Sequence, residues 1–149
     1  GSNPNLTNLS PLQGLTRTTV GGISLVSMPI VTLADLSSLT EVSGDVSISF
    51  CDEMVDPGGP PLLTTIGGAL RISFNERLAS VAGFAPLDTI GTDLSIRGND
   101  VLTDLAGLEG VDVGVDVSIR ENPVLGDANA QAFVDTLTVG GTVSISDNG

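Results

Sequence analysis

A short phrase that recurs six times constrains the fold of this 149-residue chain more than any other feature. In five copies, two aliphatic residues alternate with serine or arginine, as at residues 46–49, and the first copy, at 23–26, is looser because it ends in valine. The copies begin at residues 23, 46, 70, 94, 117 and 143, so 23 to 26 residues separate them. Alternation with period two predicts a strand with one buried and one solvated face. We therefore expect an all-β solenoid of about six coils, each about 24 residues long.

The segments between the strands predict tight turns and further core positions. Glycine and aspartate precede each strand, and glycine there is expected to allow positive φ at the corner. After the strands, aliphatic residues follow at three-residue spacing, and prolines favour extended chain over helices. Pro57 and Pro60 replace aliphatic residues in the coil spanning 54–66, which is expected to be the least well packed and the most mobile.

The last coil departs from this pattern. Residues 127–137 combine good helix formers with Asp127, which is suited to N-capping. The open ends of a solenoid expose its core and need atypical terminal repeats. The sequence therefore predicts a short C-terminal capping helix in a single β-helical repeat domain that spans 3–149, with its capping lap at 123–149. Residues 1–2 are interpreted as a remnant of cloning.

Charge and composition argue against several classes of function. A net charge of −13, with only five arginines and no lysine, repels phosphate backbones and anionic membranes. No apolar run approaches the roughly 20 residues of a membrane-spanning helix. Cys51 is the only cysteine, so neither an intrachain disulfide nor a four-cysteine metal site is possible. We expect no nucleic-acid binding, no membrane insertion and no cofactor.

The residue types also argue against catalysis. Histidine, lysine and tyrosine are absent, so the usual general bases and nucleophile activators are missing. Two alternatives stay open. Right-handed β-helices can host polysaccharide hydrolases or lyases with paired carboxylates, although no aromatic platform for sugar rings is evident here. The rows of hydroxyl groups also resemble those of ice-binding proteins, although arginines interrupt the serines.

The outward positions of the six strands form two polar columns, which are the best candidate for a recognition surface. Three of the five arginines lie there, where they would pair with carboxylate or sulfate groups of a partner. The alternative is that these charges only keep the protein soluble and prevent sheets from associating. The candidate binding residues are Arg71, Arg97, Arg120, Ser49, Ser73, Ser95 and Ser118.

One column of asparagines is assigned a structural role. It follows the strand in each coil, with Met28 and Cys51 at two positions where asparagine is missing. Stacked amides satisfy both backbone groups and each other, so we expect a ladder at this corner. The ladder residues are Asn3, Asn75, Asn99, Asn122 and Asn148.

Two smaller columns are also given structural interpretations. Asp93 and Asp116, with Asp45 two coils before Asp93, are weak candidates for calcium, which needs about six to eight oxygen ligands, so turn chemistry is preferred. Phe50 and Phe74 occur one coil apart and are expected to stack in the core rather than against a sugar.

Nearly the whole chain resembles a known family, and the likeness is carried by the following segments. The phrase at 91–99 with its continuation at 102–108, and the closing segments 122–125 and 141–148, resemble the receptor L-domain-like, leucine-rich-repeat-like repeats of bacterial surface proteins of myxobacterial type. The resemblance implies a right-handed β-helix, a secreted or surface-anchored location, and non-catalytic recognition or adhesion with a protein or glycan partner. The alternative is a structural spacer or assembly unit of a larger surface array.

Overall fold

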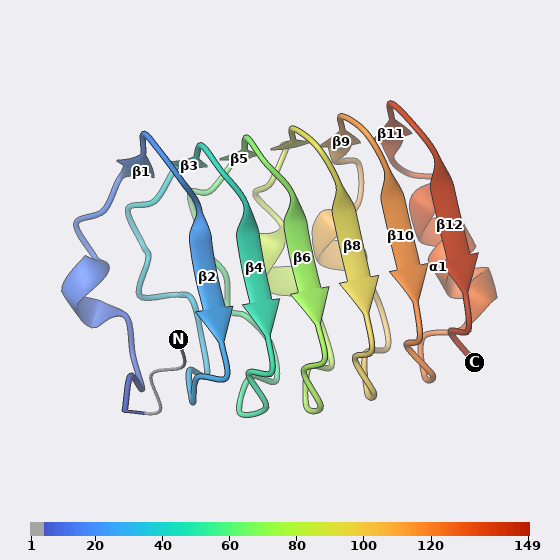
Figure 1. Ribbon diagram of the computed structural model, residues 1–149, viewed down its shortest axis with the longest axis horizontal. Coiled ribbons are helices and arrows are strands. Elements are labelled where there is room, and N and C mark those ends of the chain that lie inside the picture. Colours follow the sequence, from blue (N-terminus) through green and yellow to red (C-terminus); the bar gives the residue numbers. More distant parts are fainter. Residues whose placement is uncertain (1–4) are drawn as a thin grey trace.

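The six predicted strands form one parallel sheet in the computed structural model, which describes residues 5–149 (Figure 1). Each strand pairs with the strands of the neighbouring repeats in matching register, so that Ile48 lies beside Ile72. We call this layer the long sheet. Its strands are β2 (Ile23–Val26), β4 (Val46–Ser49), β6 (Leu70–Ser73), β8 (Leu94–Arg97), β10 (Val117–Arg120) and β12 (Val143–Ser146).

A second six-stranded parallel sheet runs along the same stack. Each of its strands has only two residues and lies just before the turn that leads into a long strand. Sequence analysis did not predict this sheet, because two residues are too few to show an alternation. The strands are β1 (Arg17–Thr18), β3 (Glu41–Val42), β5 (Thr65–Ile66), β7 (Thr89–Ile90), β9 (Asp112–Val113) and β11 (Thr138–Val139).

In Figure 1, short helical elements lie behind the long sheet, except the first, which lies at its N-terminal end to the left of β2. Three are 3-10 turns, η1 (Ser10–Leu12), η2 (Ala82–Phe84) and η3 (Ala106–Leu108). The eight-residue helix α1 (Asp127–Val134) lies in the predicted capping lap. Its N-cap is Gly126, with no side-chain capping bond, so the prediction that Asp127 caps this helix is wrong.

The core lies between these layers and consists almost entirely of aliphatic side chains. The inward isoleucines of four adjacent repeats, such as Ile72 and Ile96, are at most 1% exposed. Full burial of a side chain of this size stabilises a fold by roughly 1.5–3 kcal/mol. Met54 and Ile66 are fully buried, and Pro57 and Pro60 are buried too. The prolines therefore fill core positions, and the expectation that the coil spanning 54–66 is the least well packed and most mobile stays a prediction.

The glycines before the long strands serve close packing rather than positive φ. Of the glycines in these turns, only Gly21 has positive φ, at 80°. A Cβ on Gly91 would lie 2.2 Å from the carbonyl oxygen of Gly67, and one on Gly114 would lie 2.2 Å from that of Gly91. The backbones of successive turns thus stack too closely for any side chain. The prediction that these glycines provide positive φ is therefore wrong at every turn except that of Gly21.

The C-terminal strand is less covered than the strands inside the stack. β12 forms one edge of the long sheet, and its Val143 is 43% exposed, whereas Val117 beside it is 1% exposed. The helix α1 packs near β12 but leaves this edge partly open.

Candidate functional site

The outer face of the long sheet carries the predicted binding residues in two straight columns. Pairing places Ser73, Arg97 and Arg120 side by side on successive strands, with Ser49 preceding Ser73. The second column aligns Arg71 with Ser95 and Ser118. The structure therefore brings all seven predicted residues to one face.

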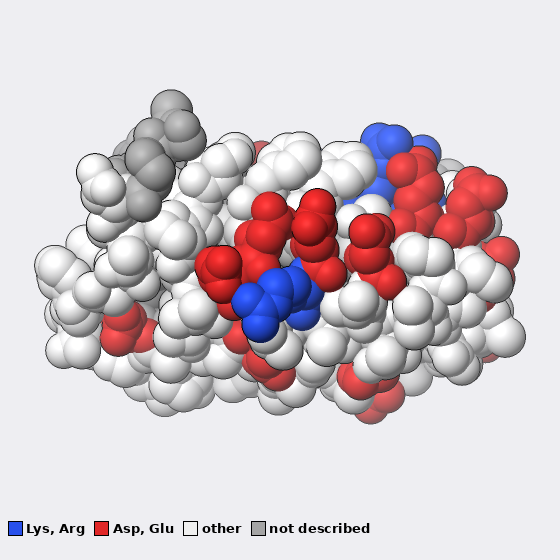
Figure 2. All heavy atoms as spheres, turned by 90° about the horizontal axis from the view of Figure 1, so that it is seen from below, with Lys and Arg blue, Asp and Glu red and all other residues white. Residues whose placement is uncertain are grey.

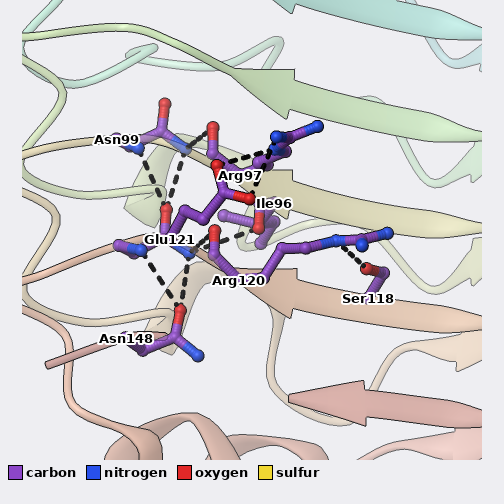
Figure 3. Close-up of polar contacts among 8 residues, drawn as sticks. Ile96, Arg97, Asn99, Ser118, Arg120, Glu121 and Asn148 are labelled. Atoms are coloured by element: carbon purple, nitrogen blue, oxygen red, sulfur yellow. Dashed lines mark hydrogen bonds and ion pairs between the residues drawn. The ribbon is translucent and has the colours of Figure 1, made fainter. Parts of the chain in front are cut away.

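Two of the three arginines on this face are already engaged by carboxylates of the same chain. The Nη1 atom of Arg71 donates to Asp45 Oδ2 over 2.6 Å, and its Nη2 lies 3.9 Å from Asp93 Oδ2. Arg97 makes a two-pronged pair with Glu121, with both N to O distances at 2.9 Å (Figure 3). The Arg97 guanidinium carbon also lies 5.2 Å from the ring centre of Phe74.

Arg120 differs from the other two. Its Nε donates to Ser118 Oγ over 3.1 Å, as Figure 3 shows. Within residues 5–149, no carboxylate lies at ion-pair distance from Arg120. Its guanidinium is therefore the charge on this face with the most capacity left for an external anion.

The asparagine column forms a continuous buried ladder beneath the same corner. Asn99 Oδ1 accepts hydrogen bonds from the backbone N–H and the Nδ2 of Asn75, at 3.2 and 3.1 Å. Asn99 Nδ2 in turn donates to Asn122 Oδ1 and to the Ile72 carbonyl, each at 3.2 Å. Asn75, Asn99, Asn122 and Asn148 are fully buried and bonded in this way, so none is available to a ligand. Asn3 lies outside the described residues.

Cys51 occupies a position of the ladder in place of asparagine. Its backbone N–H donates to Asn75 Oδ1 over 2.9 Å, and its Sγ lies 3.7 Å from the Leu25 carbonyl oxygen. Burial raises the pKa of the Cys51 thiol. A buried thiol with a raised pKa is a poor nucleophile, so Cys51 acts here as a small apolar residue with weak hydrogen bonds.

Asp127 closes the C-terminal end of the ladder. Its Oδ1 accepts hydrogen bonds from the backbone N–H and the Nδ2 of Asn148, at 3.1 and 2.8 Å. The carboxylate thus takes the place that a further asparagine would have. A contact between residues 127 and 148 replaces the local capping bond that the sequence suggested.

The aspartate column serves the turns before the long strands. Asp45 Oδ1 accepts the Ala69 N–H, Asp93 Oδ1 accepts the Asp116 N–H, and Asp116 Oδ1 accepts the Thr142 N–H. The Ala69 hydrogen bond, and then Arg71, lower the pKa of Asp45 below its ordinary value. The backbone and hydroxyl of Thr142 lower the pKa of Asp116. The described residues contain no group of three or more side chains arranged to hold a metal ion.

Phe50 and Phe74 stack as predicted, but they do so at the surface and not in the core. Their ring centres are 5.3 Å apart with an interplanar angle of 13°, and Phe50 is 49% exposed. Both residues have positive φ, 55°, as does the residue after each of the other long strands. The prediction of core packing is therefore wrong.

An acidic row beside these rings was not singled out from the sequence. Asp52, Glu76 and Asp100 recur at intervals of 24 residues, so the repeat spacing already contained the signal. Figure 2, seen from below the view of Figure 1, shows acidic side chains gathered around a basic one on this edge of the molecule. The Arg77 guanidinium pairs with Glu53 at 2.9 Å in the same loops.

Comparisons with protein families, with characterised proteins and with solved structures find no match to this chain. In the part of the chain that the structure describes, no helix has the length and apolar character needed to cross a membrane.

Proposed function

We propose that this chain is a non-catalytic recognition or adhesion module, built as a closed right-handed β-helix of the receptor L-domain type. We place it outside the cell or at the cell surface, with a protein or glycan partner. The observation that carries the proposal is the flat, in-register outer face of the long sheet, on which Arg120 retains an uncompensated charge among the described residues.

The chemistry of this face favours a partner that presents several carboxylate or sulfate groups. Arg120 and Ser118 offer hydrogen-bond donors next to each other, and Arg97 lies on the adjacent strand. A single exposed ion pair contributes only about 0–1 kcal/mol. Useful affinity therefore requires that a repetitive or extended partner engage several positions of the two columns at once.

A binding screen with glycans and surface proteins tests this proposal. The wild type is compared with Arg120→Ser and with the triple variant Arg71→Ser, Arg97→Ser, Arg120→Ser, each checked for folding by circular dichroism. Arg17→Ser is the matched control, since Arg17 is exposed and belongs to the short strand β1. Saturable binding that the triple variant loses and the control keeps supports the proposal. Binding that all variants retain contradicts it.

A second candidate function is a structural spacer or assembly unit within a larger surface array. Two observations favour it: Arg71 and Arg97 are already paired within the chain, and the β12 edge leaves Val143 exposed. Absence of any binding partner in the screen, together with concentration-dependent association in sedimentation velocity, would support this alternative.

A further inference from the structure

The stacked phenylalanines lie at the surface, and their backbone conformation is energetically unfavourable. Positive φ is unusual for a bulky residue, and a left-handed conformation is unfavourable for any residue with a Cβ. Phe50 and Phe74 both adopt it, and Phe50 is 49% exposed. The same conformation follows every long strand, so it belongs to this corner of the fold, and in these two repeats it leaves an aromatic pair at the surface.

The following repeat is shaped to hold this stack in place. Gly98 occupies the position equivalent to Phe74, and a Cβ there would lie 2.6 Å from a ring carbon of Phe74. The absence of a side chain at residue 98 thus leaves room for the Phe74 ring. Arg97 then places its guanidinium over that ring, 5.2 Å from the centre, while Glu121 holds the guanidinium by two contacts of 2.9 Å.

The chain therefore contains its own example of cation recognition, in which an aromatic face binds a guanidinium and a carboxylate pairs with it. Phe74 has neighbours from both adjacent repeats, Phe50 from the one before and Arg97 from the one after. Phe50 has Phe74 on one side only. In the preceding repeat, the equivalent position is the small, exposed Ser27.

A shallow hollow of about 490 Å³ opens at this unoccupied side of Phe50. Its lining combines apolar and acidic groups: Ser27, Met28, Pro29, Phe50, Asp52 and Glu53. Glu53 is paired with Arg77, but no arginine of the described chain lies at ion-pair distance from Asp52. The Asp52 Oδ1 atom accepts only a long hydrogen bond, 3.3 Å, from the Glu76 N–H.

We propose that this hollow is a binding site for an arginine side chain of a partner protein, which stacks on Phe50 and pairs with Asp52. The site offers the same kinds of group that hold the Arg97 guanidinium, an aromatic ring with a carboxylate nearby, but on the opposite face of the phenylalanine stack, next to Ser27. The net charge of −13 and the neighbouring acidic row attract a cationic segment over a long range. Arginine suits the site better than lysine because its planar guanidinium both stacks on a ring and pairs with a carboxylate.

Nuclear magnetic resonance with short peptides tests this site independently of the strand face. ¹⁵N-labelled protein is titrated with an acetylated, amidated Gly-Arg-Gly-Arg-Gly peptide and with its glutamine counterpart. We expect weak, saturable shifts confined to the corner around Phe50 with the arginine peptide only. Phe50→Leu, which keeps an apolar side chain at this exposed position, should weaken binding by roughly two- to fivefold, the effect of an exposed cation–π contact.

Charge controls separate the proposed pair from general attraction. Asp52→Asn should weaken binding, whereas Asp112→Asn, which removes the same charge from the exposed short strand β9, should not. Equal loss in both variants, equal binding of the glutamine peptide, or unchanged binding by Phe50→Leu overturns the proposal. Stronger shifts at Phe50 with a neutral oligosaccharide also overturn it, as does self-association that Phe50→Leu abolishes. Arg120→Ser should leave peptide binding intact, so the two proposals stand or fail separately.

Discussion

The chain turns a corner after each long strand, and the residues on the inner and outer sides of that corner differ in how much they vary from repeat to repeat. The inner positions, which directly follow the outer ones in sequence, are nearly uniform: Cys51, Asn75, Asn99, Asn122 and Asn148. The outer positions share a left-handed backbone but vary freely: Phe50, Phe74, Gly98, Glu121 and Asp147. The inner side chains must fit a shared hydrogen-bond pattern, whereas the outer ones meet solvent and one another. Recognition chemistry is therefore expected on the outer side, and stability on the inner side.

Breaking the ladder in its middle is expected to have the largest effect. Asn99→Leu removes the acceptor of two donors of Asn75 and the donor to the Ile72 carbonyl, all in buried surroundings. Each unsatisfied buried group costs about 1–3 kcal/mol, so the free energy of unfolding should fall by about 3 kcal/mol or more. Urea denaturation measures the change. Asp100→Ala, at the exposed neighbouring residue, serves as control and should stay within about 0.5 kcal/mol of the wild type.

Adding a methyl group at Gly98, on the outer side of the same corner, should lower the free energy of unfolding by less than the loss of Asn99 does. Gly98→Ala places a Cβ against the Phe74 ring and forces alanine into positive φ, 64°. We expect a loss of about 1–2 kcal/mol, because the exposed ring can move away while the backbone strain remains. Chemical shifts of the Phe50 and Phe74 rings should change, and those of the ladder amides of Asn75 and Asn122, in the adjacent repeats, should not. Large shifts at Asn75 and Asn122 would show that the two sides are coupled.

Completing the ladder should stabilise the protein slightly. Cys51→Asn introduces an amide where the Leu25 carbonyl now meets a thiol at 3.7 Å. Since a typical hydrogen bond contributes a net 0.5–1.5 kcal/mol, we expect a gain of about 1 kcal/mol in urea denaturation. Cys51→Ala is the matched variant that removes the thiol without adding an amide, and it should be destabilising. A loss of stability in Cys51→Asn would contradict the equivalence of this position with the asparagines.

Substituting the aspartates in the turns before the long strands should have the smallest effect on stability, and this effect should appear only at acidic pH. The pKa values of Asp45 and Asp116 are lowered in the folded protein, so their contribution to stability is present above the ordinary pKa, about 4, and is lost as the pH falls below it. Thermal melts from pH 6 to pH 2 should show a shallower acid decline for Asp45→Asn than for the wild type. Asp112→Asn makes the same change in net charge without removing either contact. An unaltered acid decline in Asp45→Asn would count against this assignment.

Features that repeat in every coil were predictable from the sequence. The alternation at residues 46–49 and its five counterparts located the long strands, and the fixed spacing aligned the asparagines and the outward serines. The two-residue strands were not predictable in this way, because they leave no pattern of their own. The partners of Arg71 and Arg97 were missed because an ion pair depends on side-chain direction across repeats, which spacing alone does not determine.

The predicted N-cap role of Asp127 and the predicted core position of Phe50 are both wrong. Asp127 matches the preference for aspartate at a helix start, but its carboxylate is bonded to Asn148, 21 residues away. The one-repeat spacing of Phe50 and Phe74 correctly predicts that the rings stack, but both residues adopt positive φ at the corner and the stack lies at the surface. In both cases a contact between repeats, or a corner geometry, outweighed a local preference.

The aligned amides of the asparagine ladder also produce a net dipole along the stack. Every amide in it points the same way, with Nδ2 donating to the Oδ1 of the next repeat, from Asn75 to Asn148. Such aligned dipoles add, as peptide dipoles do along a helix, and the positive end of the row meets the carboxylate of Asp127. Each bond in such a chain polarises the next. A substitution at one rung should therefore weaken rungs that it does not touch, and the row should respond as a unit rather than as separate bonds.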